Sequence, residues 1–221
     1  MVARILSCIL YYRYPQYVWA KRIKTLVTEF IDTDNLTFLD APAGDGVISF
    51  WLSKSFNNNP FILCDIDHGK MQRARRYIRG TNVTLHEANL LELAAGNTNV
   101  WLLINSLYLI DAIDVLFSRL APLCPYLVAV CPHINHVNYK SFMARHPSFT
   151  NHHELTVDET IAFFGEYGYS LMHKEDVINI PFHRYSDNFA TKAALRILFN
   201  ALDPLANKNN PAYWLAIFRR K

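Results

Sequence analysis

The sequence predicts a doubly wound α/β fold, in which a mostly parallel β-sheet carries helices on both faces. Short apolar runs alternate along the chain with segments whose apolar residues recur at helical spacing. Several runs are almost continuously apolar, which is typical of strands that are covered on both sides. With 221 residues, 51% of them hydrophobic and 19% charged, the chain has the composition of one globular domain. We therefore treat residues 1–221 as a single domain.

Seven segments are predicted to form strands. Five of them are short apolar runs, at 36–40, 61–65, 82–87, 100–105 and 126–131. Two more follow in the last quarter of the chain, at 169–177 (YSLMHKEDV) and 212–220 (AYWLAIFRR).

The helices are predicted between these strands, at 47–56, 70–79 and 112–120. A further helix is predicted within 155–167, where Thr156 and Glu159 have the spacing of a capping box and Gly168 ends the helix. Another is predicted at 188–202. Residues 1–35 are expected to form an N-terminal helical lid or cap, and 178–211 an insertion between the last two strands.

Charge and hydropathy argue against two classes of partner. The formal net charge is only +3, and the final Arg219-Arg220-Lys221 alone accounts for it, so no nucleic-acid partner is predicted. The basic residues of 70–79 are expected to form a solvated helix face. The most apolar interior run, 100–110, is interrupted by Asn105 and Ser106 and is shorter than the roughly 18 residues of a spanning helix. No integral membrane segment is therefore expected.

Cysteine and histidine usage favours a reduced, metal-free protein. The four cysteines form no C-x-x-C pair, and the opening residues show no clear secretion signal, so a cytoplasmic location is predicted. His133 and His136 have a spacing that suits a metal, but no cysteine or Glu-x-x-His motif accompanies them. No metal site is predicted.

A small-residue turn, DAPAGDG at 40–46, follows the first predicted strand. Ligands of α/β sheets bind at the carboxyl ends of the strands, where glycines let a ligand approach the backbone. Asp65 ends the second strand 21 residues after Gly44, and a carboxylate there is suited to ribose hydroxyls. A dinucleotide fingerprint would need a third glycine where Ser49 stands. Asp40, directly before the turn, would repel a pyrophosphate but attract a cationic ligand.

These segments resemble the class I S-adenosylmethionine-dependent methyltransferases. Their first motif has an acidic residue followed by x-G-x-G-x-G, and Pro42 stands here at the first glycine position. Asn89, in LHEANLLEL, stands where the family usually has an aspartate at the adenine amine, and an amide oxygen can also accept from that amine. The resemblance implies S-adenosylmethionine as the cofactor, bound by Asp40, Ala41, Pro42, Gly44, Gly46, Asp65, Ile66, Asn89, Leu90 and Asn105.

The resemblance continues beyond the glycine turn. VWLLINSLYLID is similar to the fourth-strand motif, AIDVLFSRLAPLCPYLVAV to the following helix and fifth strand, and EYGYSL and YWLAIFRR suit the last two strands. It implies a Rossmann-like, seven-stranded sheet of order 3-2-1-4-5-7-6 whose last strand is antiparallel.

The function implied is transfer of a methyl group to oxygen or nitrogen of a small-molecule acceptor. His133, in CPHINH after the fifth strand, is the candidate general base, and Tyr108 the second candidate catalytic residue. The alternative for His133 is a polar residue on the loop rim, and for Asn105 and Tyr108 ordinary packing at a strand end. NSLY at 105–108 resembles the [DN]-P-P-[YFW] tetrad of amino-group methyltransferases but lacks both prolines, so a nucleic-acid or protein acceptor is not favoured.

Two aromatic segments outside the common core are expected to select the acceptor. One is the N-terminal set that includes Tyr14, Tyr17 and Trp19, and the other is the insertion with His183 and Tyr185. The alternative is that these aromatics cover the sheet edge. Two other functions also stay open at this stage: a dinucleotide-binding oxidoreductase, and a non-catalytic member of the fold that binds the cofactor or a protein.

Overall fold

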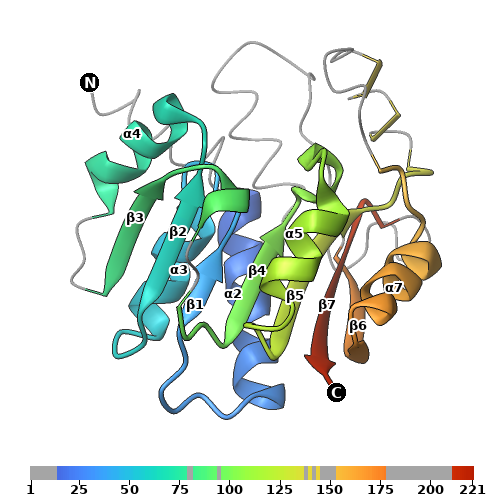
Figure 1. The fold of residues 1–221 in the computed structure, drawn as a ribbon, viewed down its shortest axis with the longest axis horizontal. Helices are drawn as coiled ribbons and strands as arrows, with labels where there is room; N and C mark the ends of the chain where they lie inside the picture. The colour runs from blue at the N-terminus through green and yellow to red at the C-terminus, as the bar shows by residue number, and fades with distance from the viewer. Residues whose placement is uncertain are drawn as a thin grey trace.

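The computed structural model describes residues 14–78, 82–93, 96–136, 139–140, 143–144, 153–177 and 211–221. Its strands form one seven-stranded sheet of order β3-β2-β1-β4-β5-β7-β6 (Figure 1). β7 pairs antiparallel with both of its neighbours, and the other pairings are parallel. This arrangement confirms the predicted fold class and strand order. The strands are β1 Phe38–Asp40, β2 Phe61–Asp65, β3 Val83–Glu87, β4 Val100–Ile104, β5 Tyr126–Pro132, β6 Tyr169–Val177 and β7 Tyr213–Arg220.

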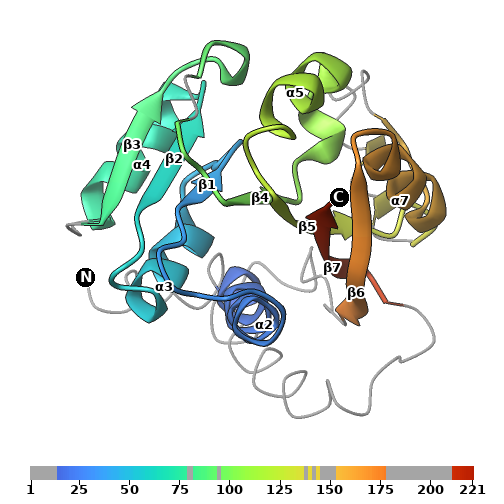
Figure 2. The ribbon, with the colours of Figure 1, turned by 60° about the horizontal axis from the view of Figure 1, so that its bottom comes forward.

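Helices cover both faces of the sheet (Figure 2). The helices α2 (Tyr14–Phe30), α3 (Val47–Ser55) and α4 (His68–Tyr77) pack on one face, and α5 (Ile113–Leu120) and α7 (Val157–Glu166) on the other. Successive side chains of β4 point to opposite faces, so that Trp101 joins the core under α5 and Leu102 the core under α2 and α3. Burial on both faces explains why these strands are almost continuously apolar.

Helix α2 is part of this core. Ile23 and Val27 are completely buried against the sheet, and Arg22 forms an ion pair with Glu175 of β6. Helix α2 therefore covers a sheet face, while Gln16 in its first turn lines the cavity described below. Among the helices described here, none combines the length and apolarity needed to cross a bilayer.

The predicted elements agree with the structure to within about two residues. β1 begins at Phe38 rather than at residue 36, and α4 begins at His68 because the side chain of Asp67 accepts the Lys70 N–H and caps the helix. The capping box of α7 is present: Thr156 and Glu159 each accept the other's backbone N–H. The predicted helix at 188–202 and the insertion 178–211 lie outside the described residues, apart from Pro211.

Candidate functional site

A cavity of about 710 Å³ lies at the carboxyl ends of β1, β2 and β4. The chain leaves β1 toward β2 on one side and returns to β4 on the other, so this is the point where the order of the strands reverses. Such switch points are where open α/β sheets bind ligands. Residues of α2, of the loops after β1, β2, β3 and β4, and of the first turn of α5 line the cavity.

The β1–α3 turn forms one wall, and its two glycines serve different purposes. Gly44 has φ +59° and lines the cavity, and a Cβ placed on it would meet no atom within 4 Å. Gly46 has φ +67°, and a Cβ there would lie 2.6 Å from Leu63 and 2.9 Å from Ile78. Gly44 therefore faces the ligand space, whereas Gly46 lets α3 pack closely on β2 and α4.

Asp65 connects the first two strand ends. One oxygen of its buried carboxylate accepts the Gly44 N–H at 2.7 Å, and the other accepts the Asp67 N–H at 2.9 Å. A carboxylate has about four lone-pair sites, so two remain for a ligand. The β1 and β2 loops are thus joined through the group that was predicted to bind a ribose.

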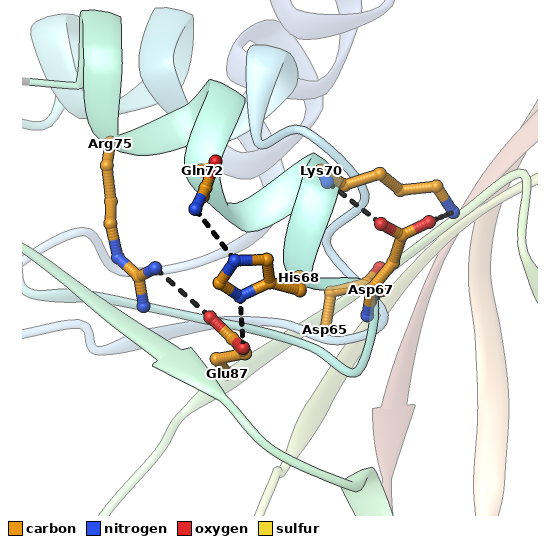
Figure 3. A network of polar contacts seen from close by, with 7 residues as sticks. All are labelled: Asp65, Asp67, His68, Lys70, Gln72, Arg75 and Glu87. Carbon is orange, nitrogen blue, oxygen red and sulfur yellow. Dashed lines mark hydrogen bonds and ion pairs between the residues drawn. The ribbon is translucent and has the colours of Figure 1, made fainter.

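Polar contacts fix the start of α4 behind Asp65 (Figure 3). Glu87, at the end of β3, accepts from Arg75 and contacts the ring of His68 at 2.6 Å, and the other ring nitrogen of His68 contacts Gln72. Hydrogen bonds from His68 and Arg75 lower the pKa of the Glu87 carboxyl. These groups are exposed, so their contribution is mainly to orient the helix.

Asp40 is the most perturbed acid at the cavity. The residue is 2% exposed, and its carboxyl accepts a hydrogen bond from the Ser49 hydroxyl at 2.6 Å. Burial raises the pKa of Asp40 from 3.8 to about 7, against the lowering effect of Ser49, and the charges of Asp65 and Asp45 add to the rise. Asp40 is therefore poised to ionise near neutral pH when a cation approaches.

The end of β3 forms the far wall. Asn89 caps a 3₁₀ turn, η1 (Leu90–Glu92), by accepting the Leu91 N–H at 3.0 Å. Ile66 lies at the cavity edge with 70% of its surface exposed. An apolar side chain beside a polar turn suits the face and edge of a flat heterocycle.

The end of β4 contributes uncharged side chains. Asn105 has φ +50°, donates its N–H to Val130 O at 2.6 Å, and forms a side-chain hydrogen bond with Tyr108. Burial raises the pKa of the Tyr108 hydroxyl above its ordinary range, so that it stays protonated. Ser106 follows Asn105 and is 4% exposed.

His133 does not line the cavity. The Nε2 atom of its ring contacts Asp176 of β6 at 3.1 Å, and its backbone N–H donates to the carbonyl oxygen of Ala212. His133 thus lies outside the residues that line the cavity, and its role as a general base stays a prediction. In the part of the chain that the structure describes, no group of three or more His, Cys, Asp or Glu side chains is arranged to hold a metal ion.

The cavity brings together most of the predicted site residues. Asp40, Pro42, Gly44, Asp65, Ile66, Asn89, Leu90, Asn105 and Tyr108 line it, whereas Ala41, Gly46 and His133 do not. Ala41 is buried in the core, where its carbonyl accepts from Trp101 Nε1.

Sequence reasoning did not assign several other lining residues to the site: Gln16, Asp45, Asp67, Ser106, Leu109 and Asp111. Ser106 and Asp67 directly follow predicted positions at strand ends, so a search one or two residues further along would have found them. Trp19, expected in the aromatic lid, also lines the cavity.

The strand order, the antiparallel β7 and the cavity at the switch point define the fold of the class I S-adenosylmethionine-dependent methyltransferases. No protein-family model matches the sequence, and no curated protein sequence matches it significantly. The similarity appears in solved structures.

Three solved structures illustrate it. The magnesium protoporphyrin IX methyltransferase of Synechocystis PCC 6803, with bound SAH, has a TM-score of 0.65 at 13% identity, over 93% of this chain and 83% of that one. An S-adenosylmethionine-dependent methyltransferase from Mesorhizobium loti has a TM-score of 0.63 at 17% identity, over 89% and 96%. The plantazolicin methyltransferase, solved with a monoazolic desmethylPZN analog and SAH, has a TM-score of 0.64 at 13% identity, over 99% of this chain and 89% of that one. At these identities the similarity establishes the fold.

Proposed function

We propose that the protein is an S-adenosylmethionine-dependent methyltransferase that acts on oxygen or nitrogen of a small molecule. The observation that carries the proposal is the convergence of Asp40 and Asp65 on one cavity, with Gly44 between them. Among the structural neighbours, one is named a magnesium protoporphyrin IX methyltransferase, and another, a plantazolicin methyltransferase, was solved with a monoazolic desmethylPZN analog.

The residues that line the cavity at the carboxyl ends of β1 to β4 fit the proposed cofactor. Asp65 keeps lone pairs for two ribose hydroxyls, Ile66 offers an apolar surface to the adenine, and Asn89 and Leu90 border the same space. Asp40 suits the cationic methionyl part. When bound, S-adenosylmethionine supplies an activated methyl group, and the uncharged residues after β4 would position the acceptor beside it.

Charge and topology weigh against a dinucleotide. The described cavity lining has one basic residue, Lys70, against five aspartates, and it would disfavour a pyrophosphate. The aspartates are Asp40, Asp45, Asp65, Asp67 and Asp111. The antiparallel β7 also departs from the dinucleotide-binding strand order.

The proposed location is the cytoplasm. Cys64, Cys124 and Cys131 are buried free thiols, and burial raises the pKa of Cys64 and Cys124 to about 11. Unreactive reduced thiols fit a reducing compartment.

Calorimetric titration with S-adenosylhomocysteine and with NAD tests the proposed function. We expect S-adenosylhomocysteine to bind and NAD to bind at least 100-fold more weakly. Asp65→Asn should weaken S-adenosylhomocysteine by about 10- to 100-fold, because hydrogen bonds to a charged group contribute about 1.5–3 kcal/mol. Asp158→Asn, on the exposed start of α7, is the matched control. Preferential binding of NAD would contradict the proposal, and turnover on an acceptor library would distinguish an enzyme from a non-catalytic binder.

A further inference from the structure

Four buried polar atoms at the α2–β4 side of the cavity have no hydrogen-bond partner within the described part of the chain. They are Gln16 Oε1, Trp19 Nε1, Asn105 Oδ1 and Ser106 Oγ, and all four residues line the cavity. Trp19 and Ser106 are only 6% and 4% exposed. Buried polar groups in folded proteins nearly always have partners, so a cluster of unpaired ones beside a cavity indicates a ligand.

Contacts within the protein hold two of these side chains in place. The Trp19 ring lies edge-on to Tyr213, with ring centroids 4.9 Å apart. The side chain of Asn105 is held by its hydrogen bond to Tyr108, and its Oδ1 is left without a partner. Trp19 and Asn105 are thus preorganised for a ligand, because these contacts restrict the rotation of their side chains.

The four atoms have a defined hydrogen-bonding pattern. Gln16 and Asn105 offer carbonyl oxygens, which require donors. The indole N–H of Trp19 requires an acceptor, and the Ser106 hydroxyl serves as either. The complement is a group with N–H donors beside a carbonyl oxygen.

The charge of the bound group can also be inferred. A carboxylate would place acceptors against the oxygens of Gln16 and Asn105, in a cavity that is rich in aspartates. An ammonium would leave the Trp19 N–H without an acceptor, at the cost of an unpaired buried donor. An uncharged carboxamide edge carries both kinds of group that the four atoms require, N–H donors for Gln16 and Asn105 and a carbonyl oxygen for Trp19 and Ser106.

We propose that Gln16, Trp19, Asn105 and Ser106 form the acceptor subsite and hold an uncharged small molecule through a carboxamide-like edge. This inference rests on the proposed function, because it assigns the rest of the same cavity to the cofactor. It names the class of methyl acceptor that this wall selects.

Three probes of similar shape test the assignment: benzamide, benzoate and benzylamine. Their binding to the full chain saturated with S-adenosylhomocysteine is measured by ligand-observed NMR, which detects millimolar affinities. Benzamide should bind at least tenfold more tightly than the other two. The proposal would be overturned if benzoate or benzylamine bound as tightly as benzamide, or if none of the three probes bound.

Two variants locate the binding. Trp19→Phe and Ser106→Ala should each weaken benzamide at least fivefold, while Trp51→Phe, on α3 outside the cavity lining, should leave it unchanged. Ser106→Ala removes an unpaired buried hydroxyl with little change in volume, so its melting temperature should stay level or rise. Trp19→Phe also removes buried ring volume beside Tyr213, so its melting temperature should fall whatever the ligand. A drop in the melting temperature of Ser106→Ala together with unchanged benzamide affinity would show that these atoms serve the fold, and would reject the subsite.

The affinity for S-adenosylhomocysteine separates this inference from the proposed function. If S-adenosylhomocysteine fails to bind the wild type, the proposed function fails. If it binds but benzamide does not, only the acceptor assignment fails. Loss of S-adenosylhomocysteine affinity in Ser106→Ala and Trp19→Phe would assign the four atoms to the cofactor and also overturn the inference.

Discussion

Asp40 is the residue at which burial and charge conflict most directly. Its ordinary pKa of 3.8 rises to about 7 because the carboxyl is buried and faces Asp65 and Asp45. A raised carboxyl pKa means that folding favours the protonated form. The resulting stabilisation is complete below about pH 4 and is lost as the pH rises through 7. A cationic ligand would reverse this preference.

The affinity for S-adenosylhomocysteine should therefore depend on pH through Asp40. If the ammonium group of the ligand requires the ionised carboxylate, affinity should fall about tenfold between pH 8 and pH 6, as the ionised fraction falls. Asp40→Asn should bind weakly and with little pH dependence. Calorimetry at several pH values measures both, and a wild-type affinity that does not change over this range would contradict the role of Asp40.

Substitutions at the two glycines of the β1–α3 turn should have different effects on stability and on ligand binding. Gly46→Ala combines a left-handed backbone with a clash against Leu63 and Ile78, so we expect a loss of about 2–5 kcal/mol. Gly44→Ala meets only the backbone penalty, about 1–2 kcal/mol, but should reduce S-adenosylhomocysteine affinity because its Cβ enters the cavity. Urea unfolding and calorimetry measure the two effects. Equal losses of stability would show that the open space at Gly44 is misassigned.

For single residues, the sequence predicts those that lie at the ends of apolar strands or in the turns just after them. Asp40, Gly44 and Asp65 are of this kind, since the carboxyl ends of parallel strands share one edge of the sheet. The sequence does not show that Gly46 is required for packing, because the space at Gly46 is limited by Leu63 and Ile78, which are distant in the sequence. Nor does it show that His133 turns toward Asp176, a residue 43 positions further along the chain.

Among the elements, α7 has the clearest local signal. Thr156 Oγ1 accepts the Glu159 N–H at 3.3 Å, and Glu159 accepts the Thr156 N–H at 2.8 Å. Thr156→Ala should cost about 1 kcal/mol, which corresponds to a melting temperature about 2–4 °C lower. Ser55→Ala, at the exposed end of α3, is the control. An unchanged melting temperature would mean that tertiary packing alone defines the start of α7.

Helices and strands are predicted well where the sequence pattern that defines them is local. Their packing is predicted less completely, because it depends on contacts between distant parts of the chain. The strands have continuous apolar runs, and the capping box lies within four residues. The N-terminal segment shows helical character, but its sequence does not reveal that Ile23 and Val27 pack on the sheet or that Gln16 and Trp19 reach the cavity. Trp19 and Tyr213, for example, join α2 to β7 across most of the length of the chain.

The whole molecule shows how a fold persists when sequence similarity is nearly absent. Its structural neighbours share only 12–17% sequence identity with this chain. The strand order is nevertheless the one that the resemblance to their family predicted. The pattern of buried strands and covering helices constrains the architecture, while most individual residues vary. The cavity follows from the architecture, and its polar lining sets what it binds.

The central claim is that Asp65 and Asp40 hold the two ends of an adenosyl amino acid. A crystal structure of the complex with S-adenosylhomocysteine tests it directly. We expect the ribose hydroxyl oxygens within about 3 Å of the Asp65 carboxylate oxygens, and the ligand's ammonium group beside Asp40. A nucleoside bound away from Asp65, or a cavity closed by the protein's own side chains, would contradict the claim.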